Sequence, residues 1–235
     1  MSRWPESDDE RLEAVLLRVD LHEGRYVAVR EYHNVVHHLL RSASAACLLD
    51  READALALIQ RACARMAEWV ELAANDRARR ATFGDLAATR GLLALSLHPD
   101  AAAADGAPHH TARALLKQTE GAPAGPVHNA RIAAAALVGE WEALRASARL
   151  CELSDAGLGV PWRKLAQAID TKDAPTIQKA AEAWLQEKME ATHTNEWGAY
   201  NEVPIEVSGA LGLAELAGVP VRLHSNRVLT RFRVS

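Results

Sequence analysis

Apolar residues recur every three or four positions along most of the chain, which is the spacing of amphipathic helices. Residues 51–74 show it best, with an apolar stripe formed by Leu56, Ile59, Cys63, Met66 and Val70. Alanine and leucine, both strong helix formers, fill most apolar positions. No stretch shows a sustained alternation of apolar and polar residues between hairpin turns, as strands would. The pattern therefore predicts a nearly all-α protein.

The same pattern gives the order of helices and breaks. We expect helices at residues 9–19, 26–49, 51–74, 83–97, 109–118, 128–138, 140–153, 162–169, 175–191 and 204–217. Gly24 is expected to break the chain before the second helix. Residues 75–82 are polar and basic and predict a loop, and residues 99–108 predict a mobile connection. The segment 121–126, rich in glycine and proline, is the strongest loop signal in the chain.

Two helical hairpins stand out in the second half of the chain, at residues 128–153 and 162–191. Gly139 is placed to end the first helix of one hairpin, and the turn 170–173 divides the other. They match at a shift of about 32 residues, within the range of helical-hairpin repeats. Short loops join antiparallel neighbours. We therefore expect an all-α fold of antiparallel helical hairpins packed in pairs, similar to a helical repeat.

The final residues, 219–234, alternate partly and predict a short extended C-terminal tail, compatible with a strand pair around Ser225. No shift in composition marks a domain boundary, and the loop 121–126 is the sole candidate. We expect residues 1–235 to form a single all-helical domain.

Composition and charge exclude several classes of protein function. The net charge is −4, from 27 basic and 31 acidic residues, and a nucleic-acid-binding surface needs a clear basic excess. The longest apolar run, residues 133–138, is far shorter than a membrane span. Cys47, Cys63 and Cys151 form no CxxC pair, and such sparse cysteines are typical of a reducing compartment. We expect a cytoplasmic protein that binds neither nucleic acid nor membrane.

A cluster of histidines, His33, His37 and His38, is the first candidate for chemistry. His33 and His37 are four residues apart and share a helix face, so they could hold a metal together with a third ligand. His22, Glu31 or His128 could supply that ligand. His33 also lies on the apolar stripe of its helix, and we favour histidines hydrogen-bonded within a helix interface.

Motifs of the common enzyme classes are missing from the sequence. There is no HExxH zinc motif, no GxSxG nucleophile elbow, and neither a Walker A nor a GxGxxG phosphate loop. Cys47 lies among apolar residues in a predicted helix, where a reactive thiolate is disfavoured. We expect no enzyme activity, no cofactor and no bound metal.

Acidic and aromatic residues at helix ends and in loops are the candidates for partner binding, because buried aromatic anchors dominate interface energies and acids complement a basic partner. This candidate set comprises Glu140, Glu142, Glu152, Asp155, Glu196, Trp197, Tyr200 and Glu202. Trp197 could equally fold back onto the core. Four further tryptophans are expected to pack between the hairpins, namely Trp69, Trp141, Trp162 and Trp184.

The second half of the chain resembles the immunity protein 49 family of bacterial polymorphic-toxin systems. The segments that carry the resemblance are AAALVGEWEAL at 134–144, LAQAIDTKDA at 165–174 and VPIEVSGALGLAELAG at 203–218. They lie within roughly the last 110 residues. The resemblance implies an all-α protein that binds a cognate secreted toxin stoichiometrically and blocks it. It implies no catalytic residues.

Three hypotheses therefore remain open at this point. The first is an immunity protein that neutralises a cognate toxin by occlusion. The second is a helical-repeat scaffold that binds a peptide or a regulatory protein. The third is a metal-dependent enzyme that uses His33 and His37.

Overall fold

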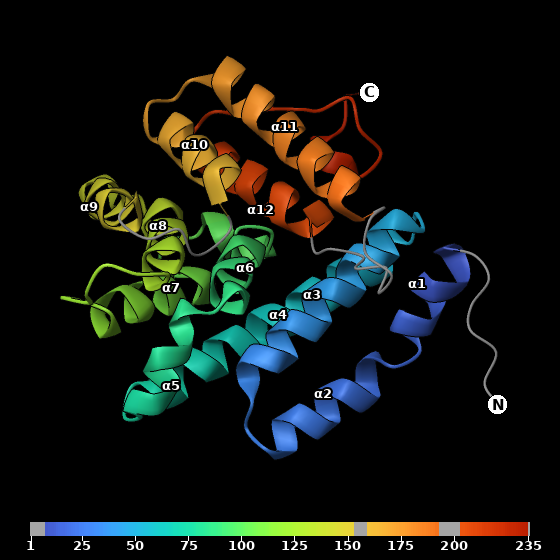
Figure 1. The fold of residues 1–235 in the computed structure, drawn as a ribbon, viewed down its shortest axis with the longest axis horizontal. Helices are drawn as coiled ribbons and strands as arrows, with labels where there is room; N and C mark the ends of the chain where they lie inside the picture. Colours follow the sequence, from blue (N-terminus) through green and yellow to red (C-terminus); the bar gives the residue numbers. More distant parts are fainter. Residues whose placement is uncertain (1–7, 153–158, 193–202, 235) are drawn as a thin grey trace.

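The computed structural model describes residues 8–152, 159–192 and 203–234, and their regular structure is helical (Figure 1). The all-α prediction is confirmed. The described residues contain an isolated bridge between Leu223 and Arg233 but no β-strand. Within the same ranges, no helix is both long and apolar enough to cross a bilayer.

Figure 1 gives the helix labels used below. In chain order the α-helices are α1 (Asp8–Leu16), α2 (Val19–Ala28), α3 (Tyr32–Leu48), α4 (Glu52–Ala73), α5 (Arg77–Ala81), α6 (Leu86–Leu95), α7 (Ala107–Gln118), α8 (Val127–Val138), α9 (Trp141–Glu152), α10 (Gly159–Asp170), α11 (Ala174–Thr192) and α12 (Val203–Leu216). Three short 3₁₀ turns are η1 (Thr82–Gly84), η2 (Pro99–Ala102) and η3 (Thr230–Phe232).

Helical hairpins are the building units, as the sequence predicts. Helices α3 and α4, α8 and α9, and α10 and α11 each pack against one another as neighbours in the chain. A left-handed residue ends the first helix of each pair: Asp50, Gly139 and Lys172 have φ values of 55°, 74° and 56°. After each of them the next amide donates to the carbonyl five residues back, which is the Schellman motif. The two hairpins of the second half thus share one turn geometry.

Some predicted boundaries are wrong. Gly24 lies inside α2, and the break falls instead at Arg30, whose φ is 59°. The predicted loop 75–82 contains α5, because the Asp76 side chain accepts the amides of Ala78 and Arg79 and caps a short helix. The connection 99–108 includes η2 and the start of α7.

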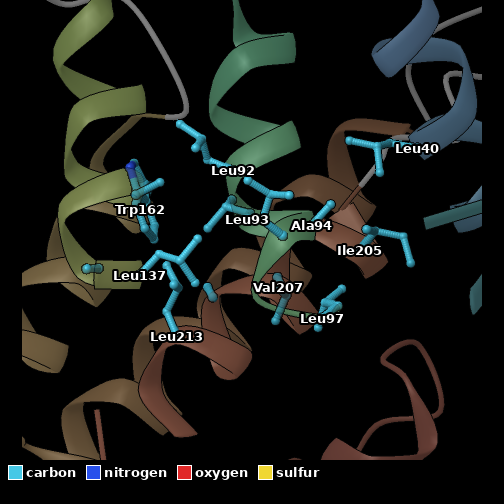
Figure 2. Close-up of a cluster of buried hydrophobic side chains, with 14 of the residues drawn as sticks. Leu40, Leu92, Leu93, Ala94, Leu97, Leu137, Trp162, Ile205, Val207 and Leu213 are labelled. Atoms are coloured by element: carbon cyan, nitrogen blue, oxygen red, sulfur yellow. The ribbon is translucent and has the colours of Figure 1, made fainter. Parts of the chain in front are cut away.

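Helices α6 and α12 lie at the centre of the molecule and contact most other hairpins. Every residue of α12 from 205 to 214 is buried. Figure 2 shows Leu93 of α6, Leu213 of α12, Leu137 of α8 and Trp162 of α10 in one apolar cluster. A continuous cluster of buried apolar residues extends from Tyr32 to Phe232.

The crossing of α6 and α12 is unusually close. A Cβ atom on Gly209 would lie 2.5 Å from the backbone oxygen of Leu93, and one on Gly212 would lie 2.6 Å from Ser96 Oγ. The hydroxyl of Ser96 lies 2.6 Å from the carbonyl oxygen of Gly209. Glycine is therefore required here for backbone approach, although it lowers helix propensity.

A buried ion pair joins the same two helices. Arg90 of α6 donates from Nε to the carboxylate of Glu206 of α12, whose side chain is 2% exposed. Arg90 Nη1 also lies 3.5 Å from His37 Nδ1 of α3. A buried charge needs such a partner, since leaving it unpaired costs several kcal/mol. The pair therefore fixes how α6 and α12 are placed relative to each other.

Helix α2 is attached to α4 by charge. The buried carboxylate of Glu23 accepts hydrogen bonds from Arg61 Nε at 3.0 Å and Arg65 Nε at 2.8 Å. Asp20 accepts from Arg61 at 2.6 Å, and Glu68 accepts from Arg65 at 2.7 Å. This network orients α2 along the outside of the first hairpin.

The C-terminal tail covers the corner between α3 and α4. Thr230 donates its amide to Glu52 Oε1 at 3.0 Å, and its hydroxyl also bonds to the Glu52 carboxylate. Arg233 lies 3.6 Å from Asp50. Phe232 is fully buried. The tail is extended, and its pairing is limited to the bridge at Leu223 rather than the strand pair that the sequence allows.

Replacing Gly209 with alanine should destabilise the protein, because the new Cβ would overlap the Leu93 carbonyl. We expect the free energy of unfolding to fall by about 1–3 kcal/mol, the usual cost of overpacking a core. Urea unfolding followed by circular dichroism measures the change. Gly24→Ala is the matched control, since nothing lies within 4 Å of its Cβ position and alanine should add about 0.5–1 kcal/mol there. Equal stability of Gly209→Ala and wild type would contradict the close crossing.

Glu23 should make stability depend on pH. Burial alone would raise the pKa of Glu23, but the hydrogen bonds and charges of Arg61 and Arg65 outweigh burial and lower it. Its stabilisation is therefore present above the ordinary pKa of 4.5 and is lost as the pH falls through the lowered value. Glu23→Gln should cost about 1–3 kcal/mol at pH 7, and the difference should shrink in acid.

Urea unfolding of both proteins at pH 7 and at pH 3 measures this effect. Glu13→Gln is the control, because Glu13 bridges the exposed Arg51 at 3.1 Å and exposed ion pairs contribute at most about 1 kcal/mol. A Glu23→Gln deficit that stays constant down to pH 3 would contradict the assignment of the effect to the carboxylate charge.

Candidate partner-binding site

The corner between α8 and α9 holds the candidate site. Gly139 adopts the left-handed conformation after α8, and the Glu140 amide donates to the Ala135 carbonyl at 2.9 Å. The chain therefore reverses within two residues, and α9 begins at Trp141. Glu142 follows in the first turn of α9, where a carboxylate is favoured by the helix dipole. This tight turn places an aromatic residue between two acids at an exposed corner.

A hollow of about 550 Å³ opens at this corner. It is lined by Gly139, Glu140, Trp141, Glu142, Ala143 and Arg145. Glu140 and Glu142 are exposed, whereas Trp141 is partly buried against the apolar core. Arg145, the one basic residue of the lining, is paired with Asp170. The hollow therefore offers an apolar surface beside two exposed carboxylates, an arrangement that suits a basic side chain with an apolar stem.

The position of α9 is fixed from both sides of the corner. Arg145 forms a two-pronged ion pair with Asp170 at the end of α10, with N–O distances of 2.8 and 2.9 Å. This carboxylate raises the pKa of Arg145. On α8, Arg131 donates to the Leu116 carbonyl at 2.9 Å and to Thr119 Oγ1 at 2.7 Å. The lining residues are thus carried on a braced helix.

Burial lowers the pKa of Arg131, and the charges of Glu120 and Glu140 partly counteract that effect. Glu140 therefore has two roles at the turn. Its charge supports the half-buried guanidinium of Arg131, and its side chain is exposed at the hollow.

The structure brings together Glu140 and Glu142 of the predicted partner-binding set. Glu152 ends α9, and its side chain lies outside the described residues. The remaining members of the set also lie outside the described residues, namely Asp155, Glu196, Trp197, Tyr200 and Glu202. The described site is therefore the α8–α9 corner.

The tryptophans divide into core and surface residues. Trp69, Trp162 and Trp184 are fully buried, as predicted, and the rings of Trp162 and Trp184 lie 6.2 Å apart. Trp141 was expected between the hairpins but is only partly buried and lines the hollow. Sequence reasoning thus missed Trp141 as a site residue. The available signal was its place between two acids, directly after a glycine that ends a helix.

The histidine cluster lies in helix interfaces. His33 packs near Trp69 with ring centroids 6.3 Å apart, and His37 lies beside Arg90. His38 stacks on His22 of α2 at 4.6 Å. His128 lies elsewhere, on α8, 3.1 Å from the Pro123 carbonyl. Across the ranges that the structure describes, no group of three or more histidine, cysteine, aspartate or glutamate side chains is placed to hold a metal ion.

All three cysteines are buried in the described core. Desolvation raises the pKa of Cys47 to about 11 and that of Cys63 to about 12. Cys151 donates to Asn129 Oδ1 at 3.2 Å. The thiols of Cys47 and Cys63 are therefore protonated at neutral pH and are poor nucleophiles.

Comparison of the chain with known protein families, with curated proteins and with solved structures gave no match.

Native protein should react slowly with a thiol reagent, because Cys47, Cys63 and Cys151 are all buried. Titration with 5,5′-dithiobis(2-nitrobenzoic acid) at pH 7.5 should release little thionitrobenzoate within minutes. In 6 M guanidinium chloride, three thiols per chain should react. Rapid reaction of Cys47 or Cys63 in the folded protein would contradict their burial and their raised pKa values.

Proposed function

We propose that the protein is an immunity protein, which binds a cognate bacterial toxin and neutralises it by stoichiometric occlusion. The observation that carries the proposal is the hollow at the α8–α9 corner, where Trp141 lies between two exposed carboxylates. The corner also lies in the first segment of the family resemblance, residues 134–144. The segment that carries the resemblance therefore includes the residues that form the acidic and aromatic surface of the hollow.

The energetics of the corner suit protein recognition. Trp141 is already partly packed, so ordering it on binding costs little conformational entropy, and large rigid aromatics are frequent anchors of interfaces. Neither Glu140 nor Glu142 has an ion-pair partner within the described ranges. Both can therefore pair with arginine or lysine of a partner without first breaking an internal bond.

Occlusion requires a rigid surface, and the bracing of α9 provides one. The Arg145–Asp170 pair ties α9 to the next hairpin, and Arg131 ties α8 to α7. A preorganised binding surface loses less free energy on association than a mobile one. A basic surface near a toxin's active site is the matching partner.

A helical-repeat scaffold for a peptide is the second candidate. The observation that favours it is the shared Schellman turn of α8–α9 and α10–α11, at Gly139 and Lys172. Repeated hairpins of this kind form extended binding surfaces. Under this alternative, the corner would bind a basic peptide, and no toxin would be involved.

Reversing the charge at the corner should weaken toxin binding. We expect Glu140→Arg/Glu142→Arg to lower the affinity for the cognate toxin, sought as the product of an adjacent gene, on the order of 10- to 100-fold, because two attractive pairs become repulsive. Isothermal titration calorimetry on the copurified pair measures the affinity, and survival of toxin-expressing cells measures protection.

Glu71→Lys/Asp105→Lys is the matched control, because it makes the same change in net charge at exposed sites outside the hollow. If the corner variant binds the toxin as tightly as this control, the corner is not the interface. If wild-type protein neither binds nor protects against the toxin, the immunity function is wrong.

A further inference from the structure

The outer face of α2 is apolar. The large apolar residues with the greatest exposure in the described chain are Leu17 at 83%, Leu21 at 72% and Val29 at 61%. Leu21 lies on α2, Leu17 lies in the turn before it and Val29 directly follows it, and the exposed Gly24 and Ala28 follow Leu21 at helical spacing. We call Leu17, Leu21, Gly24 and Ala28 the α2 stripe. Single exposed leucines are ordinary, but two highly exposed leucines four residues apart, followed by exposed small residues, are typical of an interface.

The opposite face of α2 explains why the stripe points outward. Glu23 is buried there and holds Arg61 and Arg65 of α4. Val19, Tyr26 and Val27 pack against the core cluster. Since one buried carboxylate and three apolar residues already attach α2, rotating the helix to bury Leu21 would break the Glu23 network. The stripe therefore remains exposed to solvent.

The charges beside the stripe are basic. Arg18 and Arg25 are exposed and seven residues apart, which places them on one edge of the stripe, and the exposed Arg30 follows its end. None of these arginines has an ion-pair partner in the described ranges, although Arg25 lies over the Tyr26 ring. The neighbouring acids are already engaged, since Asp20 binds Arg61 and Glu31 binds Asn34. The available charge along the stripe is positive.

We propose that the α2 stripe docks an amphipathic helix of a partner protein, with leucine-like residues on its apolar face and glutamate or aspartate on the edge that meets Arg18 and Arg25. The smooth line at Gly24, where a Cβ position has no atom within 4 Å, lets a second helix axis approach closely. An apolar seam with charged residues along its edges is also the pattern by which paired helices recognise each other.

This surface is separate from the α8–α9 corner, and the inference goes beyond the toxin-binding proposal. In Figure 1, α9 lies at the left of the molecule and α2 at the bottom, well apart from each other. The acidic corner and the basic stripe also call for partners of opposite charge. The helix-docking proposal can therefore fail while the toxin-binding proposal holds, and the reverse.

A second copy of the chain fits the stripe less well. An antiparallel pair centred on Leu21 would place Arg18 of one copy beside Arg25 of the other, and like charges at such positions are unfavourable. An anionic membrane fits less well too, because the stripe contains no aromatic anchor and has alanine and glycine where a surface helix carries large residues.

A displayed peptide library tests the proposal. The library consists of helices with leucine at every third or fourth position and randomised residues at the flanking positions. It is selected on wild-type protein and counter-selected on Leu17→Asp/Leu21→Asp, whose changes are exposed and spare the core. We expect enriched binders to carry glutamate or aspartate at the flanking positions and to lose at least tenfold in affinity on the counter-selection variant.

Arg18→Glu/Arg25→Glu is the charge test, with Arg113→Glu/Arg149→Glu as the control of equal charge change at exposed sites on other helices. Selection on the first variant should enrich lysine or arginine instead, and selection on the control should not. The proposal is overturned if the selection yields no binder that depends on the stripe, or if the binders carry no acidic residues at the flanking positions. Stripe-dependent self-association in sedimentation, or stripe-dependent binding to phosphatidylglycerol vesicles with no peptide binder, would overturn it in favour of a second copy or a membrane.

Discussion

The close crossing of α6 and α12 is the constraint on which the rest of the fold depends. Gly209 allows the backbone of α12 to reach the Leu93 carbonyl, and Arg90 pairs with Glu206 at the same interface. The contact at Gly209 requires a residue without a side chain. The contact between Arg90 and Glu206 requires two opposite charges at a buried position. Together they fix both the distance and the rotation of the central helices, and the outer hairpins pack around that fixed pair.

Both proposed binding surfaces lie on outer helices that are held by ion pairs. Helix α9 is tied to α10 through Arg145 and Asp170, and α2 is tied to α4 through Glu23. Directional bonds of this kind specify the rotation of a helix more sharply than apolar packing, which is non-directional. In each case, polar contacts on the inner side determine which residues face solvent. The side chains that both proposed surfaces present therefore depend on internal salt bridges.

Local patterns were sufficient to predict most of the fold. The stripe in residues 51–74 became α4 with little change, and Gly139 ends α8 as expected. Gly24 was misread, because one glycine costs a helix only about 1 kcal/mol and packing overrides it. Among the proposed partner-binding residues, Glu140 and Glu142 were named from their type and place in the sequence, and both line the hollow. The outward face of α2 could not be found, because burial of Glu23 depends on arginines 38 and 42 residues further along.

The tail contact has a consequence for how the chain reaches its final form. Thr230 covers the α3–α4 corner through Glu52, a partner 178 residues earlier in the chain. Contacts of such long range form late, because the intervening chain must first be ordered. On the ribosome, the first hairpin would leave its corner open until the last residues of the described chain emerge. During that interval, the apolar surface that Phe232 later covers is accessible to chaperones.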